Sequence, residues 1–279
     1  MNIWIPKRDL IYQRRRFGPP FRRGICNSMV VNPYIIGSGA AAYQVGAIDM
    51  ASPNYVRSAI FTGQVASKKI IFSAWVKITA TSGQLWQGRD AGGTSYCDIT
   101  IGNVGSNASL SVILKDLGTT TLLNISNTTG FSLNAWHHIA AACDLTTAGA
   151  RMIMVDGTND TTVTTFANTA NIAYDLCNNM GWGNNRLQSN KVPGCIAEMY
   201  LALGQYLDLT NGANLAKFRD AGNHPVDLGA TGSTPTGSAP SCLSHIATGT
   251  GVATDWATNR AGNGNWTVGG TPALCGTSP

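Results

Sequence analysis

The feature that most constrains the fold is a set of short segments in which apolar residues alternate with other residues. Residues 70–78 read IIFSAWVKI. In an extended chain, one face of this segment carries Phe72, Ala74, Val76 and Ile78, and the other carries Ser73, Trp75 and Lys77. A period of two predicts a β-strand with one buried face. We also expect the rings of Trp75 and of Trp136, in the next segment, to fill the sandwich core.

Three more segments follow the same logic: 136–143 (WHHIAAAC), 152–155 (MIMV) and 195–203 (CIAEMYLAL). In the last, strict alternation puts Cys195, Ala197, Met199, Leu201 and Leu203 on one face and Ile196, Glu198 and Tyr200 on the other. The MIMV segment runs into Asp156-Gly157, a pair typical of a type I′ turn, which predicts a hairpin there.

Composition favours strands over helices. Gly, Thr, Asn and Ser are plentiful, and Glu198 is the only glutamate among 279 residues. With 43% apolar residues, the chain can build a core. One short helix is predicted over Ala213–Asp220, capped by Thr210 or Asn211, with Leu215 and Phe218 on its buried side and Gly222 after its end. The expected fold class is an all-β antiparallel sandwich.

Positive charge is concentrated in an N-terminal arm. Residues 7–23 hold seven basic residues against Asp9, whereas the whole chain carries only +5. Such an arm could neutralise the phosphates of packaged nucleic acid, dock on an acidic protein surface, or be a solvated tail. Apolar residues are interleaved with the arginines, which favours protein docking. The predicted anchoring residues are Trp4, Lys7, Arg8, Tyr12, Arg14, Arg15, Arg16, Phe17, Phe21, Arg22 and Arg23.

This pattern divides the chain into three parts: the arm at 1–24, the sandwich at 25–209 with an entry segment at 25–54, and an extension at 210–279 that packs on the sandwich. No signal peptide or membrane-spanning stretch is visible in the sequence, so we expect synthesis in a cytoplasm and no membrane partner. The seven cysteines are scattered and never spaced as CxxC. We interpret them as buried free thiols, not as a disulfide framework or a zinc site.

The strand segments resemble a known family. Residues 68–78 (KKIIFSAWVKI), 135–145 (AWHHIAAACDL) and 150–160 (ARMIMVDGTND) follow the order seen in laminin-G-like, concanavalin-A-like jelly rolls. The version found in structural proteins of tailed bacteriophages and prophages is the most similar. Its last strand, helix and tail resemble GCIAEMYLALGQYLDLT, NLAKFRDAG, HPVDLGATGSTPTGSAP and NRAGNGNWTVGG. The likeness runs from about Gly46 to Gly270 and does not include the arm.

The resemblance implies a structural protein of the phage virion. The first hypothesis is a head decoration or minor capsid protein held by the arm, or else a tail or fibre component. Its partners would be other virion proteins, further copies of the chain, and packaged nucleic acid at the arm. The second hypothesis is a lectin-like module of the tail that binds a host glycan through Trp86, Trp182 and Arg186, which are expected in loops. Aromatic rings stack on sugar faces, although the same residues can be ordinary core anchors.

Enzymatic chemistry is the least favoured hypothesis. Glucanases of this class carry an E-x-D-x-E strand, and a chain with one glutamate cannot contain it. Asp156, Asn159 and Asp160 could bind calcium, but Asp-Gly-Thr-Asn is also ordinary hairpin chemistry, so no cofactor is expected. His137 and His138 are adjacent in a strand and should point to opposite faces. We therefore interpret these two histidines as packing residues and not as a metal pair.

Overall fold

The computed structural model describes residues 43–50, 55–58, 63–185, 187, 189–247 and 251–279. All of the predicted arm residues, from Trp4 to Arg23, lie outside the described residues, as do Arg186 and most of the entry segment. The regular secondary structure of the described part consists mainly of β-strands.

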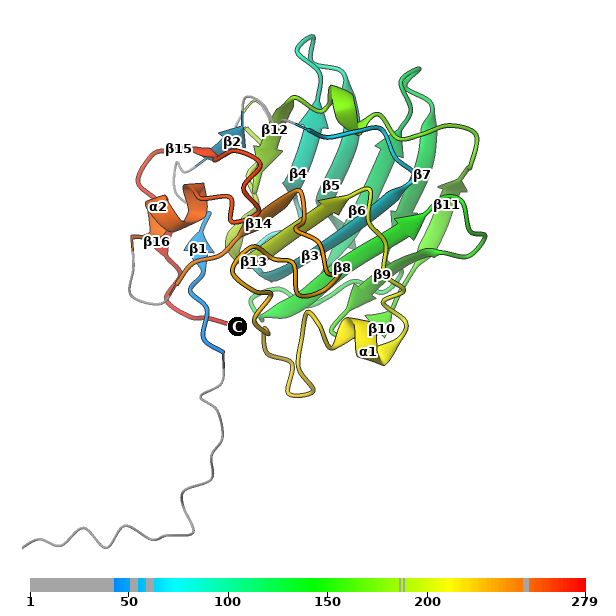
Figure 1. The fold of residues 1–279 in the computed structure, drawn as a ribbon. Helices are drawn as coiled ribbons and strands as arrows, with labels where there is room; N and C mark the ends of the chain where they lie inside the picture. Colours follow the sequence, from blue (N-terminus) through cyan, green and yellow to red (C-terminus); the bar gives the residue numbers. More distant parts are fainter. Residues whose placement is uncertain (1–42, 51–54, 59–62, 186, 188, 248–250) are drawn as a thin grey trace, which may run out of the picture. The chain divides into compact units, whose positions relative to one another are not determined.

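Two antiparallel sheets lie face to face in this part of the chain (Figure 1). Sheet I has the order β10 (Thr158–Asn159), β9 (Arg151–Val155), β8 (His137–Asp144), β3 (Lys69–Ile78), β13 (Gly194–Leu203), β1 (Ile48–Asp49) and β16 (Ala273–Leu274), and β14 (Cys242–Ser244) also pairs with β13. Sheet II has the order β11 (Thr162–Phe166), β7 (Thr121–Ser126), β6 (Asn107–Lys115), β5 (Ser95–Val104), β4 (Gly83–Arg89), β12 (Asn179–Trp182), β2 (Tyr55–Ser58) and β15 (Thr267–Gly269). The expected all-β sandwich is confirmed.

The alternation in β3 sets the core between the sheets. Its residues Phe72, Ala74, Val76 and Ile78 face inward, as predicted, and join the main apolar cluster. The cluster includes Cys97, Ile99 and Ile101 from β5 across the sandwich. Burying the apolar face of each sheet against the other is what stabilises this two-layer arrangement.

β13 departs from strict alternation. Opposite Trp75 and Ser73 of β3 lie Ala197 and Tyr200, so β13 holds one more residue than β3 between these pairs. This β-bulge includes Glu198, whose φ is +47°. The bulge reverses which alternate residues of β13 point toward the core. Cys195 and Ala197 lie on the outer face of sheet I, whereas Met199 and Leu201 face the core. The predicted single face from Cys195 to Leu203 is therefore wrong.

The hairpin at Asp156-Gly157 is confirmed. Val155 of β9 pairs with Thr158 of β10, and the two residues between them have φ values of +48° and +85°. Positive φ at both central positions is the signature of a type I′ turn, which Gly adopts freely and Asp tolerates.

The C-terminal region covers the outer face of sheet I and also supplies the sheet strands β14, β15 and β16. The predicted helix is shorter than expected: α1 spans only Gly212–Leu215, with the Asn211 side chain accepting a hydrogen bond from the Ala213 N–H. After α1 the chain turns, and Phe218 packs edge-on against Tyr200 of β13 with ring centroids 5.2 Å apart. This tertiary contact, and not helix propensity, fixes the position of Phe218. The second helix, α2, spans Val252–Ala257.

The cysteine interpretation holds only in part. Cys97, Cys143, Cys177 and Cys242 are buried and free, as expected. Cys195 and Cys275, however, form a disulfide with Cα atoms 6.0 Å apart. Because Asp49 of β1 pairs with Cys195 on one side and Ala273 on the other, β1 holds the two cysteines close together. The two cysteines are 80 residues apart, and this spacing does not indicate a disulfide in the sequence. Cys26 lies outside the described residues. Within the described part, no helix is long and apolar enough to cross a membrane.

Candidate functional site

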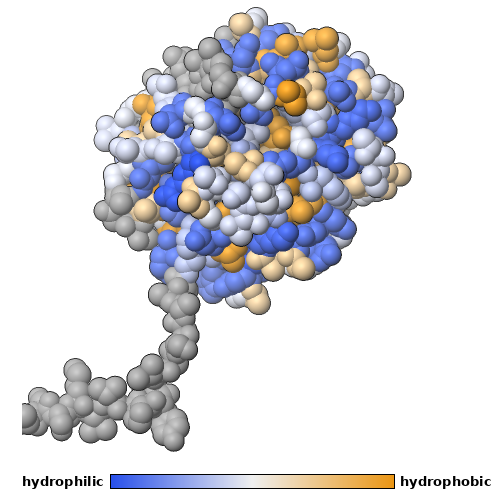
Figure 2. Space-filling view, in the orientation of Figure 1, coloured by the Kyte–Doolittle hydropathy of each residue, from blue (hydrophilic) through white to orange (hydrophobic). Residues whose placement is uncertain are grey.

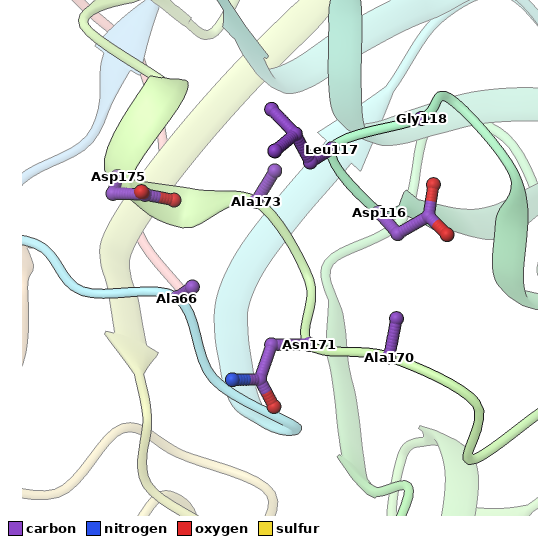
Figure 3. A pocket seen from close by; sticks show the side chains of 8 residues that line it. All are labelled: Ala66, Asp116, Leu117, Gly118, Ala170, Asn171, Ala173 and Asp175. Atoms are coloured by element: carbon purple, nitrogen blue, oxygen red, sulfur yellow. The ribbon is translucent and has the colours of Figure 1, made fainter.

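A groove of about 290 Å³ lies at one end of the sandwich, the upper end in Figure 1. Three segments line it: the β6–β7 turn, the chain between β11 and β12, and the chain before β3. Figure 3 shows the lining residues Ala66, Asp116, Leu117, Gly118, Ala170, Asn171, Ala173 and Asp175. Figure 2 shows hydrophobic residues gathered at this end on an otherwise mostly polar visible surface. We call this concave site the rim groove.

The β6–β7 turn makes one wall of the rim groove. The Asp116 carboxylate accepts a hydrogen bond from the Thr120 N–H at 2.8 Å, and the Thr119 N–H donates to the Asp116 carbonyl at 3.0 Å. These bonds close a tight turn, with Thr119 at a φ of +67°. Leu117 is held at the tip of the turn with 69% of its surface exposed. An apolar residue fixed in solvent is available to a ligand.

The opposite wall is anchored to β6 of sheet II and to the chain that precedes β3. The Ile172 and Ser67 backbones form an isolated β-bridge, and the Ala173 N–H donates to the Lys115 carbonyl at 3.1 Å. A short 3₁₀ helix, η1 (Tyr174–Leu176), follows and carries Asp175. In Figure 3, Leu117 and Ala173 approach each other from the two walls. The rim groove therefore combines an apolar surface with two carboxylates and one amide.

The two tryptophans expected to contact glycans are not in loops. Trp86 lies in β4 and Trp182 in β12, they are paired opposite each other, and both side chains are fully buried. Trp182 stacks on Trp266 with ring centroids 4.9 Å apart, and its Nε1–H donates to the Ser244 hydroxyl at 2.8 Å. A ring with no exposed face cannot stack on a sugar. These residues are core anchors, and Arg186 lies outside the described residues.

The three candidate calcium ligands do not converge on one point. Asp156 accepts hydrogen bonds from the His137 imidazole and the His138 N–H, at 2.6 and 2.9 Å. Asp160 accepts from the N–H groups of Thr128 and Thr129, at 2.9 and 3.0 Å. The side-chain oxygen of Asn159 accepts a hydrogen bond from the Thr161 hydroxyl. Their oxygens thus act as turn acceptors. Among the described residues, no group of three His, Cys, Asp or Glu is arranged to hold a metal ion.

The two histidines of β8 do point to opposite faces. His138 is fully buried on the outer face, where it contacts Trp75 with ring centroids 5.1 Å apart and the Ser73 hydroxyl at 2.9 Å. Burial lowers the pKa of His138 to about 3, so it is neutral at physiological pH. His137 instead packs against Phe131, with centroids 5.3 Å apart. Both are packing residues.

Trp75 and Trp136 occupy different environments from those predicted. Trp75 is buried, but under the segments that cover the outer face of sheet I and not between the sheets. Trp136 precedes β8 and is only partly buried, and its Nε1–H donates to the Thr277 hydroxyl at 3.2 Å. The expectation that both rings fill the inter-sheet core is therefore wrong. The reason is that residues 43–47, together with Cys275, form an apolar layer on the outer face of sheet I.

Sequence reasoning missed a buried polar cluster at the β13 bulge. The Glu198 carboxylate accepts a hydrogen bond from the His245 imidazole, whose Nδ1 also lies 3.0 Å from the Tyr43 hydroxyl. Burial raises the pKa of Glu198, while His245 opposes that rise. The one available signal was that Glu198 is the only glutamate in the chain. Because both neighbours approach the same imidazole nitrogen, the cluster cannot relay a proton through the ring, and it serves as a structural junction.

The outer face of sheet II carries a closed polar network. The Asp98 carboxylate accepts hydrogen bonds from the side chains of Gln84, Gln87 and Ser95, at 2.5, 2.8 and 2.6 Å. Since these groups satisfy one another, the network fixes the face of the sheet and leaves the rim groove as the better candidate for ligand binding.

Residues 52–202, more than half of the chain, match the family described as the concanavalin A-like lectin/glucanases superfamily. The chain belongs to this family. Membership agrees with the two antiparallel sheets, but within the family the fold alone does not assign a ligand. No curated protein matches the chain.

Several solved structures are similar to this chain, and one from Bacteroides ovatus shares its fold. This Bacteroides ovatus protein, assigned to carbohydrate binding, is 13% identical with a TM-score of 0.54, covering 84% of this chain and 60% of its own. A pentraxin from Limulus polyphemus is 11% identical with a TM-score of 0.44, covering 62% and 82%. Domains LG4-5 of the mouse laminin α1 chain are 16% identical with a TM-score of 0.44, covering 60% and 44%. This chain thus spans less than two thirds of the Bacteroides and laminin chains.

Proposed function

We propose that the described domain is a non-catalytic glycan-binding module and that the rim groove holds a neutral sugar. The observation that carries the proposal is the composition of the groove: exposed Leu117 and small alanines beside the oxygen-bearing side chains of Asp116, Asn171 and Asp175. Membership of a lectin-containing family supports it.

The chemistry of a sugar matches this lining. A pyranose ring presents C–H groups on its faces and hydroxyls around its edge. Leu117 and Ala173 offer apolar contact to the C–H face. Carboxylate oxygens accept charge-assisted hydrogen bonds from hydroxyls, which are about twice as strong as neutral ones. A volume near 290 Å³ is at the small end of ligand pockets, which suits a short stretch of glycan.

The charge of the lining selects among sugars. The groove is lined by two carboxylates, Asp116 and Asp175, with no basic side chain among its lining residues. An anionic sugar would bring a third negative charge close to these two and be repelled. Neutral glycans are therefore the expected ligands.

The position of Glu198 excludes the only glutamate of the chain from glycan cleavage, so a cleaving pair would have to be two aspartates. Glycan cleavage requires two carboxyl groups on either side of the bond. The single glutamate is buried beside His245 at the β13 bulge, so it cannot face a glycan in solvent.

A glycan array followed by calorimetric titration of the full chain tests this proposal. We expect saturable binding of neutral glycans, weakened at least about tenfold by Leu117→Ser and by Asp175→Asn. Leu187→Ser is the matched control, because Leu187 is 65% exposed and does not line the groove. The proposal fails if no glycan binds, or if the groove variants bind as well as the control.

A location in a tailed-phage virion is a second, separate proposal that rests on the sequence resemblance. The basic arm would mount the glycan-binding module on the particle, as a head decoration or a tail component. All arm residues lie outside the described residues, so deletion of the arm is the direct test.

A further inference from the structure

Two buried thiols lie close together beneath the rim groove. Cys97 is an inward-facing residue of β5, and Cys177 directly follows η1. Their sulfur atoms are 3.6 Å apart, and both side chains are buried in the core. They are 80 residues apart in the chain, so the fold, and not the sequence, brings them together.

A glycine makes this approach feasible. Gly88 of β4 is paired with Cys97, and a Cβ atom placed on Gly88 would lie only 2.6 Å from the Cys177 sulfur. Any larger residue would therefore push Cys177 away. The missing side chain at Gly88 creates the space in which the two sulfurs meet.

Cys177 is also hydrogen-bonded to the segment that forms one wall of the groove. Its N–H donates to the Tyr174 carbonyl at 3.0 Å and closes η1. Ala173 and Asp175, on the two sides of Tyr174, line the groove. A covalent bond from Cys177 to β5 would consequently fix this wall to sheet II.

We propose that Cys97 and Cys177 are the site of a second disulfide bond. The oxidant is a small-molecule disulfide or a thiol–disulfide oxidoreductase. One cysteine thiolate attacks the oxidant to give a mixed disulfide, and the second thiolate displaces the oxidant's remaining sulfur. Two S–H bonds are lost and one S–S bond forms. The two electrons and the two protons convert the oxidant's disulfide to two thiols, with the protons exchanged through solvent. The Cys195–Cys275 bond shows that the chain already accommodates such a cross-link.

Burial determines when this bond forms. It raises the pKa of the Cys97 thiol, and the neighbouring Cys177 raises it further. Because the thiolate is the nucleophile, oxidation of the folded protein is slow. The bond is therefore expected to close during folding, when both sulfurs are still accessible. Once closed, it is shielded from reductants by the same burial.

Peptide mapping of the full chain tests the site directly. The chain is folded in a buffer of reduced and oxidised glutathione, free thiols are blocked by alkylation after denaturation, and the digest is analysed without reduction. We expect a linked pair of peptides containing Cys97 and Cys177. The Cys195–Cys275 pair is the internal positive control, and Cys143 and Cys242, also buried and free, should be alkylated. The proposal is overturned if Cys97 and Cys177 are both alkylated in a sample where Cys195–Cys275 has formed.

Variants provide a second measurement. Wild-type protein that contains both disulfides should melt roughly 5 °C or more above wild-type protein that contains only Cys195–Cys275. The reason is that the second bond closes a long loop. Cys97→Ser and Cys177→Ser should each abolish this increase, while Cys143→Ser retains it. An increase that persists in Cys97→Ser would contradict the proposal. If a serine variant does not fold, the mapping of the wild-type chain still decides. This inference is independent of glycan binding.

Discussion

The imidazole of His245 donates a hydrogen bond to the carboxylate of Glu198, and both side chains are buried on the outer side of sheet I. Glu198 occupies the β13 bulge at a φ of +47°, where a residue other than glycine is strained. The strain is retained because the bulge directs the carboxylate toward His245 and Tyr43. This junction ties the start of the described chain to β13 and to the C-terminal region.

Stability should depend on pH through Glu198. Burial raises its pKa above the usual value near 4.5. When the pKa of a carboxyl group is higher in the folded state than in the unfolded state, the group stabilises the fold fully at a pH below its unfolded-state pKa. This stabilisation is lost as the pH rises through its folded-state pKa. We therefore expect the wild-type protein to lose free energy of unfolding relative to Glu198→Gln as the pH rises from 4 to 7. The loss should be about 1.4 kcal/mol for each unit of pKa elevation.

Denaturant unfolding of both proteins at several pH values measures this difference. The remaining titrating groups are shared, so their contributions largely cancel. The charged and titratable groups that act on Glu198 are His245, Asp227, Arg260 and Tyr43. The opposite result would be a wild-type free energy of unfolding that increases relative to Glu198→Gln as the pH rises. It would show that the interaction of Glu198 with His245 lowers the Glu198 pKa by more than burial raises it.

Trp75 and Trp136 should differ in their contribution to stability. Trp75 is 1% exposed and packs on His138, so Trp75→Ala should cost about 3–5 kcal/mol. Trp136 is only partly buried, so Trp136→Ala should cost about 1–2 kcal/mol. Thermal or denaturant unfolding of the two variants tests the ranking. Equal losses would mean that residues 43–47 and Cys275 do not form an apolar layer over Trp75.

Trp182 should contribute to the core and not to glycan contact. Trp182→Ala should lower the free energy of unfolding by about 3–5 kcal/mol, because a fully buried ring stacked on Trp266 is lost. Trp182→Phe keeps an aromatic ring but loses the hydrogen bond to Ser244, which should cost about 1–3 kcal/mol. In titrations of folded protein, glycan affinity should be unchanged in Trp182→Phe. A selective loss of affinity in that variant would restore the aromatic-contact hypothesis.

Deletion of residues 1–24 should leave the sandwich folded and abolish incorporation into particles. The arm holds seven of the 19 Lys and Arg residues and little of the strand pattern, so circular dichroism of the shortened chain should remain β-type. Replacing Arg14, Arg15 and Arg16 by serine, compared with replacing Trp4, Tyr12 and Phe17, separates charge from apolar docking. Loss of the β signal, or normal incorporation of the shortened chain, would contradict the anchoring hypothesis.

Local chemistry is what the sequence alone determined. Alternation in β3 predicts its inward face because side chains of successive strand residues point to opposite sides. Asp156-Gly157 predicts its turn because two consecutive positive φ angles restrict the residues that fit. The opposite facing of His137 and His138 follows from the same period of two. Each of these predictions depends on interactions within a few residues, and each is confirmed.

Only the tertiary structure decided the features that depend on register and on distant segments. The bulge at Glu198 inverts the facing of β13, and no local pattern reveals it, because a bulge is defined by the partner strand. Cys195 and Cys275 meet because β1 lies between β13 and β16, and Trp86 and Trp182 are buried because they face the main apolar cluster. The rim groove combines residues 66, 116–118 and 170–175, which are brought together by the packing of loops at one end of the sandwich. Contacts of this range are set by the burial of the whole chain and not by any single segment of it.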